Sequence, residues 1–247
     1  MKQTMRLEKL LAHAGHGTRS EIKRMVKNGL VQVNDRPIKD GGMQVHPEQD
    51  RITVDGQVVR YREFMYLMLN KPQGVISATE DSRERTVLDL LDEAYAHFEL
   101  FPVGRLDKDT EGLLLLTNDG KLAHNLLSPR KHVAKMYFAE VEGLVTAKDQ
   151  EIFQNGVTLD DGYLTMPAQL NILEAGNPEK GVVAKIELTI QEGKFHQVKR
   201  MFEAVGKRVV FLKRISMGTL LLDEYLAPGA YRELTEHELA QLQLAHV

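Results

Sequence analysis

The spacing of apolar residues at the amino end of the chain predicts a small helical and strand module. Residues 5–12 carry leucines at helical spacing, so we expect one apolar helix face there. Two glycines follow, and a capping-box pattern at residues 18–21 then begins a second helix that runs to Lys27. Short alternating strands are predicted at residues 30–34 and 51–56. Two helices and a small β-ribbon are therefore expected in the first 60 residues.

A longer region of mixed periodicity begins at Phe64, after a short polar linker. Strand and helix patterns follow one another there without regular β–α–β alternation. We therefore expect an α+β fold, in which a mainly antiparallel mixed sheet with flanking helices occupies residues 64–247 and a separate domain occupies residues 1–60. The predicted strands are 64–69, 112–117, 135–142, 182–190 and 209–215, and the predicted helices are 87–93, 122–127, 148–155, 195–205 and one after the capping box at 235–238.

Composition narrows the class of protein. The 247 residues are 43% hydrophobic and 27% charged, which is typical of a globular chain that can bury its own core. Cysteine is absent, which excludes disulfides, thiolate nucleophiles and iron–sulfur clusters and favours the cytoplasm. No apolar stretch follows Met1–Arg6, so we expect no signal peptide and a cytoplasmic, soluble protein. Nucleotide-binding and zinc-protease motifs are also missing, and we expect neither a cofactor nor a metal.

Charge is distributed unevenly. The net charge of −3 argues against a nucleic-acid partner, but residues 1–60 carry 11 Lys and Arg against 7 Asp and Glu, a net of +4, which leaves −7 for the remainder. A second basic stretch, residues 194–214, has seven basic residues and one acidic residue. Two basic regions in an acidic chain are typical of phosphate contacts. The alternative is a pair of solvated charged faces, and charge alone leaves both interpretations open.

The densest polar segment is residues 104–112, which holds three acids and two bases just before a predicted buried strand. One interpretation is a rigid active-site loop that presents a carboxylate. The other is a charged surface turn in which aspartate supplies local capping hydrogen bonds. The residues by themselves do not decide among Asp107, Asp109 and Glu111.

A second polar segment, residues 192–202, leads from a turn into a helix. Its first two helical turns carry His196, Lys199 and Arg200. Because a helix start has free N–H groups, added cations there suit a phosphate or a carboxylate. The alternative is a solvated amphipathic helix whose apolar side belongs to the core.

Four short motifs in the first 60 residues form a recognisable order. They are Arg6-Leu7-x-Lys9, Thr18-Arg19-Ser20-Glu21, Gly29-x-Val31-x-Val33-Asn34 and Val54-Asp55-Gly56. Together they resemble the S4 RNA-binding domain, which places two helices and a β-ribbon against structured RNA. The resemblance implies that six cations face RNA: Arg6, Lys9, Arg19, Lys23, Arg24 and Lys27.

Longer motifs follow in the rest of the chain. They are Asn70-Lys71-Pro72-x-Gly74, Gly104-Arg105-Leu106-Asp107-x-Asp109-Thr110-x-Gly112, Lys135-x-Tyr137 and Glu192-Gly193-x-x-His196-Gln197-Val198-Lys199-Arg200-Met201-Phe202. Together they resemble the pseudouridine synthases, in particular the RsuA/RluB/RluE/RluF group, which carries an S4 domain. The motif around His196 and residues 226–235 are most similar to the RsuA branch. That branch implies isomerisation of a uridine in 16S ribosomal RNA, expected at uridine 516.

The resemblance also implies roles for individual residues. Asp107 takes the place of the family's catalytic carboxylate, which acts either as a nucleophile at C1′ or through a glycal-type intermediate. Lys199 takes the place of its basic partner. Many relatives have arginine there, and because lysine is a point charge rather than a bidentate clamp, the neighbouring Arg200 stays a second candidate.

Three further positions carry implied substrate contacts. Tyr137 corresponds to the family's active-site tyrosine, which stacks on the uracil, and Leu188 lies near its apolar position beneath the base. The sequence alone favours a core role for Leu188, and only the motif argues against a core role for Tyr137. Arg105 is expected to contact RNA or to fill the space that a flipped nucleotide leaves.

The resemblance implies a ribosomal RNA partner, either 16S RNA or a small-subunit assembly intermediate, and a monomeric enzyme. The alternatives are a uridine in 23S ribosomal RNA and a non-catalytic S4 RNA-binding factor.

Overall fold

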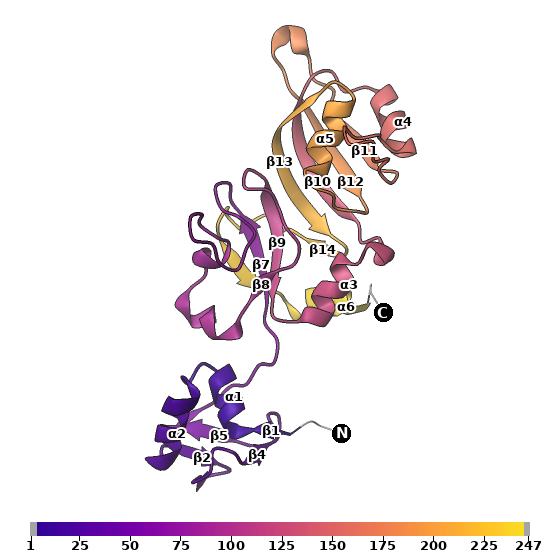
Figure 1. Cartoon of the computed structure of the whole chain (residues 1–247). Helices are drawn as coiled ribbons and strands as arrows, with labels where there is room; N and C mark the ends of the chain where they lie inside the picture. Colours follow the sequence, from indigo (N-terminus) through magenta and orange to yellow (C-terminus); the bar gives the residue numbers. More distant parts are fainter. Residues whose placement is uncertain (1–3, 245–247) are drawn as a thin grey trace. The chain divides into compact units, whose positions relative to one another are not determined.

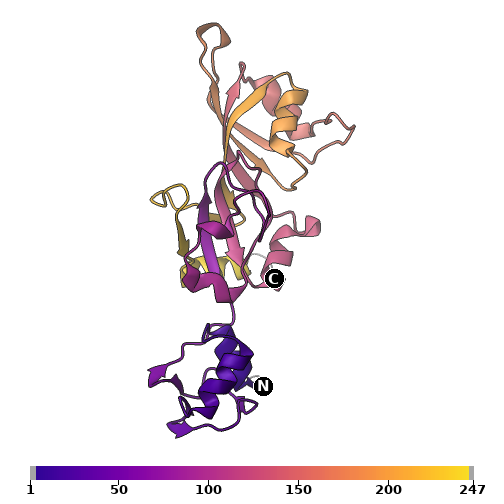
Figure 2. The same ribbon diagram turned by 60° about the vertical axis from the view of Figure 1, so that its left-hand side comes forward.

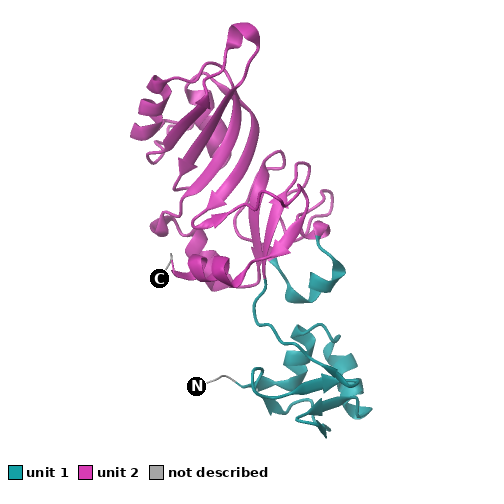
Figure 3. Ribbon diagram, turned by 180° about the vertical axis from the view of Figure 1, so that it is seen from behind, with its two compact units in different colours: residues 1–65, 91–100 teal, residues 66–90, 101–247 magenta. Residues whose placement is uncertain are grey.

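A computed structural model describes residues 4–244 of the chain (Figure 1). Figure 2 shows the same ribbon from a second side, and Figure 3 distinguishes two compact units. Unit 1 comprises residues 1–65 and 91–100, and unit 2 comprises residues 66–90 and 101–247. Residues 91–100 thus interrupt the larger unit along the sequence and belong to unit 1. Within residues 4–244, every helix is too short or too polar to cross a bilayer.

Unit 1 contains the two helices and two strands that its apolar spacing predicts, together with further short strands and a 3-10 helix. The apolar faces of its two helices share a core with its strands, and Leu10 and Ile22 are completely buried. The capping box forms, because the Thr18 side chain accepts a hydrogen bond from the Glu21 amide and the Glu21 carboxylate accepts one from the Thr18 amide. The elements are β1 (Met5–Arg6), α1 (Leu7–His13), α2 (Arg19–Lys27), β2 (Val31–Val33), β3 (Arg36–Pro37), β4 (Gln44–Val45), β5 (Ile52–Val54), β6 (Gln57–Val58) and the 3-10 helix η2 (Glu93–Phe98).

Unit 2 is organised around one sheet, with nine strands within the described residues. Its main path runs β11-β12-β10-β13-β9-β7-β15, with β14 on β13 and β8 on β9. Neighbouring strands are antiparallel except β13 and β9, which are parallel, so the expected α+β fold with a mainly antiparallel sheet is confirmed. The strands are β7 (Tyr66–Lys71), β8 (Phe101–Pro102), β9 (Glu111–Thr117), β10 (Lys135–Glu142), β11 (Gln169–Glu174), β12 (Ala184–Ile190), β13 (Arg208–Met217), β14 (Leu220–Leu221) and β15 (Tyr231–Glu233).

Helices α4 and α5 lie together against one face of this sheet (Figures 1 and 2). The Phe153 and Phe202 rings join them, with centroids 4.9 Å apart. The helices of unit 2 are η1 (Leu88–Leu90), α3 (Gly120–Leu127), η3 (Pro129–Lys131), α4 (Ala147–Asn155), η4 (Pro178–Lys180), α5 (Gln197–Ala204) and α6 (Glu236–Leu244).

Two predicted helices differ from the structure. The helix expected at residues 87–93 is replaced by the short 3-10 helices η1 and η2. There the Asp89 carboxylate accepts a hydrogen bond from the Thr86 amide, which favours a local turn over a continued helix. The helix expected at residues 195–205 begins only at Gln197, because His196 adopts a left-handed conformation with φ of 48°.

The parallel contact between β9 and β13 depends on a glycine. Gly112 pairs with Arg214 and has φ of +103°. A Cβ at this position would lie 2.2 Å from the backbone oxygen of Arg214, so no larger residue fits without moving a strand. The close approach places the loop before β9 beside β13, the strand that follows α5.

Candidate active site

Asp107 lies in the loop between β8 and β9, and buried groups beneath the loop fix its backbone. The Lys71 ammonium donates to the carbonyl oxygens of Thr110 at 2.8 Å and Asp107 at 3.0 Å. The Ser77 hydroxyl donates to the Leu106 carbonyl and accepts from the Leu106 amide, both at 3.0 Å. Lys71 is completely buried, and this burial lowers its pKa to about 8. The loop is therefore positioned by a buried cation and a buried hydroxyl.

The Asp107 carboxylate faces the amino-terminal part of α5. Lys199 Nζ lies 3.3 Å from Asp107 Oδ2 and 2.6 Å from Asp109 Oδ1. Burial lowers the pKa of Lys199, but its hydrogen bond to Asp109 and the charges of both carboxylates outweigh burial, and the net shift is upward. For Asp109 the signs are reversed. Burial raises the pKa of this carboxyl, but the hydrogen bond from Lys199 and its charge lower the pKa by more, so the net shift is downward. The ammonium therefore remains charged between two carboxylates.

Arg200, the second candidate partner, points elsewhere. Its Nε donates to Asp160 Oδ1 at 2.6 Å, and Nη2 lies 2.7 Å from Asp161 Oδ2. Its Nη1 also donates to the carbonyl oxygen of Phe195 at 3.3 Å. Of the two basic residues, Lys199 lies next to Asp107. Arg200 instead joins the turn at Phe195 to the segment that carries Asp160 and Asp161.

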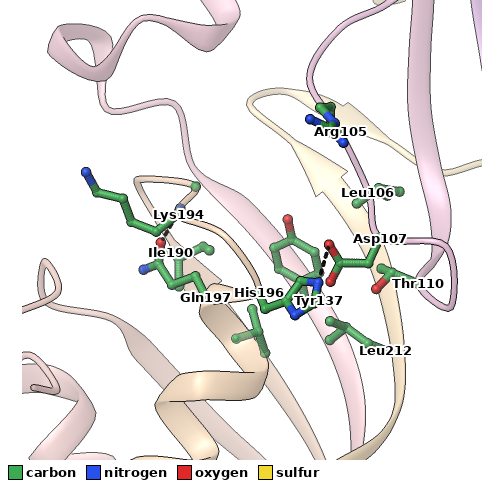
Figure 4. Close-up of a pocket in the computed structure, with 12 residues that line it drawn as sticks. Arg105, Leu106, Asp107, Thr110, Tyr137, Ile190, Lys194, His196, Gln197 and Leu212 are labelled. Atoms are coloured by element: carbon green, nitrogen blue, oxygen red, sulfur yellow. Dashed lines mark hydrogen bonds and ion pairs between the residues drawn. The ribbon is translucent and has the colours of Figure 1, made fainter. Parts of the chain in front are cut away.

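A small pocket of about 80 Å³ opens beside Asp107 (Figure 4). Tyr137 on β10 forms one wall and is 8% exposed. Ile190 on β12 and Leu212 on β13 supply apolar side chains to the same pocket. A pocket bounded by an aromatic ring, aliphatic side chains and a carboxylate suits a flat nucleobase.

Leu188 lies outside this pocket. It pairs directly with Tyr137 across β10 and β12, but it is completely buried and does not line the cavity. Leu212, on the opposite neighbour of β10, reaches the pocket instead. Alternation along a strand places both leucines on the core face, and only the position of the loop carrying Asp107 decides which of them meets the cavity.

The rim of the pocket is basic. Arg105 is exposed and lines the rim, and no side chain within residues 4–244 pairs with its guanidinium. Lys194 lies on the other side of the opening (Figure 4). His196 Nε2 is 3.6 Å from Asp107 Oδ1. The opening therefore presents groups that suit a polyanion, while the interior presents a carboxylate and apolar surface.

The six cations expected to face RNA in the S4 resemblance belong to unit 1, and all six are exposed. Arg6 makes a 3.7 Å contact with Glu8, which is a surface ion pair of small energetic value. Four of the six lie on α2, whose other face is buried in the core. This set is Arg6, Lys9, Arg19, Lys23, Arg24 and Lys27.

Three residues of the site have no role in the sequence-based assignment: Lys71, Ser77 and Leu212. A detectable signal existed only for Lys71, since it is an ionisable residue at the end of an apolar strand.

Among residues 4–244, no three acidic or histidine side chains are grouped to hold a metal ion. The chemistry available at the pocket is that of a carboxylate, a phenol and an ammonium.

Comparison with known proteins identifies the family of the chain. The family of RNA pseudouridylate synthases matches residues 65–204, and the S4 domain matches residues 5–51. The chain is 55% identical to an RNA pseudouridine synthase of Bacillus subtilis, YtzG, over 95% of this chain and 97% of that protein. It is 42% identical to the ribosomal small subunit pseudouridine synthase A of Yersinia pestis, over 98% and 100%.

Two further relatives extend the comparison. Ribosomal large subunit pseudouridine synthase B of Bacillus subtilis is 39% identical over 96% of this chain and 95% of its own length. The crystal structure of a pseudouridylate synthase aligns with a TM-score of 0.67 and 36% identity, covering 96% of this chain and 99% of the other. The fold is thus that of an RNA-modifying isomerase. The chain belongs to the pseudouridine synthase family and carries an amino-terminal S4 domain.

Proposed function

We propose that this protein isomerises a uridine of 16S ribosomal RNA to pseudouridine, expected at uridine 516, with Asp107 as the catalytic carboxylate. The observation that carries the proposal is the Asp107 carboxylate, 3.3 Å from the Lys199 ammonium at a pocket walled by Tyr137. The 16S substrate is favoured by the small-subunit synthase, which is 42% identical over its whole length. A 23S substrate is the alternative, because a large-subunit synthase is 39% identical.

The reaction rearranges bonds without changing the composition of the nucleoside. The N1–C1′ bond breaks with its electron pair moving to the uracil, the uracil turns within the pocket, and C5 bonds to C1′. C5 then loses its proton and N1 gains one, so the product is an isomer. Asp107 acts at the sugar, either by bonding to C1′ or by removing a proton from C2′ to give a glycal. Lys199 opposes the negative charge of this carboxylate before it reacts and again when the carboxylate is released.

We assign to Tyr137 the role of holding the detached uracil. Its ring forms the pocket wall and is almost completely buried, so it offers a fixed face for stacking. A base that turns must stay in the pocket between the two bond changes, and stacking tolerates rotation about the ring normal better than directional hydrogen bonds do. We assign Tyr137 this role, together with assistance in moving the C5 proton.

The target uridine must leave its stack to reach Asp107, at a cost of a few kcal/mol. Arg105, exposed and unpaired within the described residues, is placed to occupy the space the nucleotide leaves or to bind its phosphate. The cations of unit 1 add phosphate contacts that offset the cost of flipping.

Replacement of the three neighbouring acids tests the catalytic assignment. Asp107→Asn should form no pseudouridine on ribosomal RNA while it folds and binds RNA as the wild type does. Asp109→Asn and Glu111→Gln remove one charge each from the same loop and should still form product. The product is measured as the pseudouridine released by nuclease digestion. Product from Asp107→Asn, or loss of product only in Asp109→Asn, would contradict the assignment.

A separate experiment tests the substrate. Purified enzyme is incubated with 16S transcripts, 23S transcripts and small-subunit assembly intermediates, and pseudouridine is mapped at nucleotide resolution. The same mapping is done on ribosomal RNA from a deletion strain with and without the gene restored. We expect one 16S site to depend on the enzyme. A dependent 23S site with intact 16S modification would favour the alternative, and binding without modification of either RNA would favour a non-catalytic S4 factor.

The role of α2 is tested by salt dependence. Changing Arg19, Lys23 and Lys27 to glutamine should weaken RNA binding and reduce the slope of log K against log salt by roughly 0.7–0.9 for each phosphate that the variant no longer neutralises. The matched control changes Lys121 and Lys148 on helices of unit 2, and it should leave the slope unchanged. An unchanged slope in the α2 variant would show that this helix does not bind phosphates.

The proposed substrate also predicts a cytoplasmic enzyme that acts as a monomer. Light scattering of the purified protein without RNA should give the mass of one chain, 28.0 kDa.

A further inference from the structure

An aromatic ring lies uncovered beside the active-site pocket. Phe195 is 75% exposed, and it sits in the chain between Lys194 and His196, which both line the pocket. A single exposed apolar residue is common on protein surfaces and needs no explanation by itself. The position of this ring and the way it is held distinguish it from such residues.

The ring is fixed by its neighbour. Phe195 stacks on the His196 imidazole, with centroids 3.8 Å apart and planes inclined by 18°. His196 has φ of 48°, a left-handed conformation that residues other than glycine adopt at a cost. The same imidazole places Nε2 3.6 Å from Asp107 Oδ1. The left-handed residue thus carries an imidazole that stacks on Phe195 and also lies beside the Asp107 carboxylate.

Hydrogen bonds from buried and neighbouring side chains hold the turn that carries these rings. The buried Gln197 side chain accepts a hydrogen bond from the Lys194 amide at 2.9 Å and donates one to Glu192 at 2.8 Å. Arg200 donates to the Phe195 carbonyl at 3.3 Å. Because the turn is ordered by these contacts in the free protein, a ligand that stacks on Phe195 pays little ordering entropy.

A nucleobase is the flat group that the substrate brings to this position. When a uridine leaves its stack to enter the pocket, the neighbouring base loses a stacking partner on one face. Proteins hold such unstacked bases on phenylalanine, tyrosine and histidine rings. Lys194, exposed on the same turn, supplies a cation for the phosphate that joins the two nucleotides.

We propose that Phe195, stacked on His196, binds the base next to the target uridine and so selects substrates in which that neighbour is unpaired. This inference rests on the proposed function, since it requires an RNA whose uridine enters the pocket. It assigns to Phe195 a positioning and specificity role, because the ring meets the neighbouring nucleotide and not the reacting atoms.

Substitution of Phe195 separates stacking from simple apolar contact. On the ribosomal RNA that the wild type modifies, Phe195→Ala should raise KM by about 5- to 150-fold, which corresponds to about 1–3 kcal/mol at 1.4 kcal/mol per tenfold. The single-turnover rate at saturating RNA should fall much less. Phe195→Trp should keep a KM near the wild type, and Phe195→Leu should resemble the alanine variant. Tyr225→Ala removes another exposed ring, which is 90% exposed and does not line the pocket, and should leave KM unchanged.

RNA without the neighbouring base gives the decisive comparison. Synthetic substrates carry an abasic nucleotide on the 5′ side or on the 3′ side of the mapped uridine. One of the two should raise the KM of the wild type as Phe195→Ala does, and should have no further effect in Phe195→Ala. Independent effects on both sides, a KM within twofold of wild type for Phe195→Ala, or a leucine variant as good as tryptophan would overturn the proposal. Failure of the proposed function is distinct, because the wild type itself would then form no pseudouridine on 16S or 23S RNA.

Discussion

Replacing Lys71 with methionine tests whether a buried cation positions the catalytic loop. The side chain keeps its length but loses an ammonium that donates to the Asp107 and Thr110 carbonyls and to the Pro72 carbonyl at 3.0 Å. Each carbonyl left unpaired in the interior costs about 1–3 kcal/mol. Removing a buried charge returns part of this cost. The pKa of Lys71 is lowered by burial from 10.5 to about 8, so confining its proton costs about 3 kcal/mol.

Removing the buried charge offsets only part of the loss in stability, and it does not offset the loss in catalysis. We expect Lys71→Met to lose about 2–3 kcal/mol of unfolding free energy, which lowers Tm by roughly 5–10 °C in a chain of this size. The carbonyl of Asp107 itself would be released, and a displacement of about 1 Å in a catalytic group costs on the order of 100-fold in rate. The expected signature is therefore a modest loss of Tm with a loss of about 100-fold in kcat and little change in KM.

Lys135 provides a matched control. Burial, together with the nearby charge of Arg214, also lowers its pKa to about 8, and Nζ donates to the Val133 carbonyl at 3.0 Å, but it touches no part of the catalytic loop. Lys135→Met should change kcat by less than about threefold. Thermal unfolding and single-turnover pseudouridine formation are measured for both variants at pH 7, where both lysines are protonated. A kcat for Lys71→Met equal to that of Lys135→Met would refute the positioning role, whatever the Tm.

Three other substitutions have expected outcomes. Lys199→Arg should keep most of the activity because a cation still opposes the carboxylate, whereas Lys199→Met should lower kcat by about 100-fold or more in the same assay; equal rates would contradict the ion-pair role. Gly112→Ala should lose about 3 kcal/mol or more of stability, seen as a lower Tm, because its Cβ would overlap the Arg214 backbone; an unchanged Tm would contradict that contact. Glu238 has its pKa lowered to about 2, chiefly by hydrogen bonds from Arg232, so stability present above pH 4.5 should be lost as pH falls toward 2. The wild type should exceed Glu238→Gln by roughly 1–2 kcal/mol in chemical unfolding at pH 7, and the gap should shrink below pH 3; a gap independent of pH would refute this coupling.

Secondary structure could be predicted wherever apolar residues recur with a clear period. Strand β10 begins and ends at the residues expected, 135–142, because its alternation is unbroken. Strand β11 escaped prediction: half of the residues of Gln169–Glu174 are polar, most of them are exposed, and the strand lies at the edge of the sheet. Its strand conformation depends on pairing with β12, which is a contact distant in sequence.

The catalytic loop marks the limit of sequence reasoning about the site. Asp107 and Asp109 are the same residue type two positions apart, and both bind Lys199. They differ in their position in the fold. The Asp107 side chain is 28% exposed and lines the pocket, whereas the Asp109 side chain is 68% exposed and does not line it. Residue type alone could not make that distinction, and the family resemblance was needed to make it.

The shared lysine has a consequence for the chemistry of the pocket. Lys199 Nζ lies nearer to Asp109 than to Asp107, so the stronger contact anchors the ammonium outside the pocket. A cation anchored in this way can oppose the Asp107 carboxylate without closing on it, and His196 Nε2, at 3.6 Å from the other Asp107 oxygen, is too distant for a strong hydrogen bond. With the loop backbone fixed by Lys71 and the ammonium fixed by Asp109, the carboxylate that we propose as catalytic is held by its surroundings rather than by its own ion pair. Such an arrangement supports a nucleophile better than a tight, fully satisfied salt bridge would, because no bidentate contact must break before the carboxylate acts.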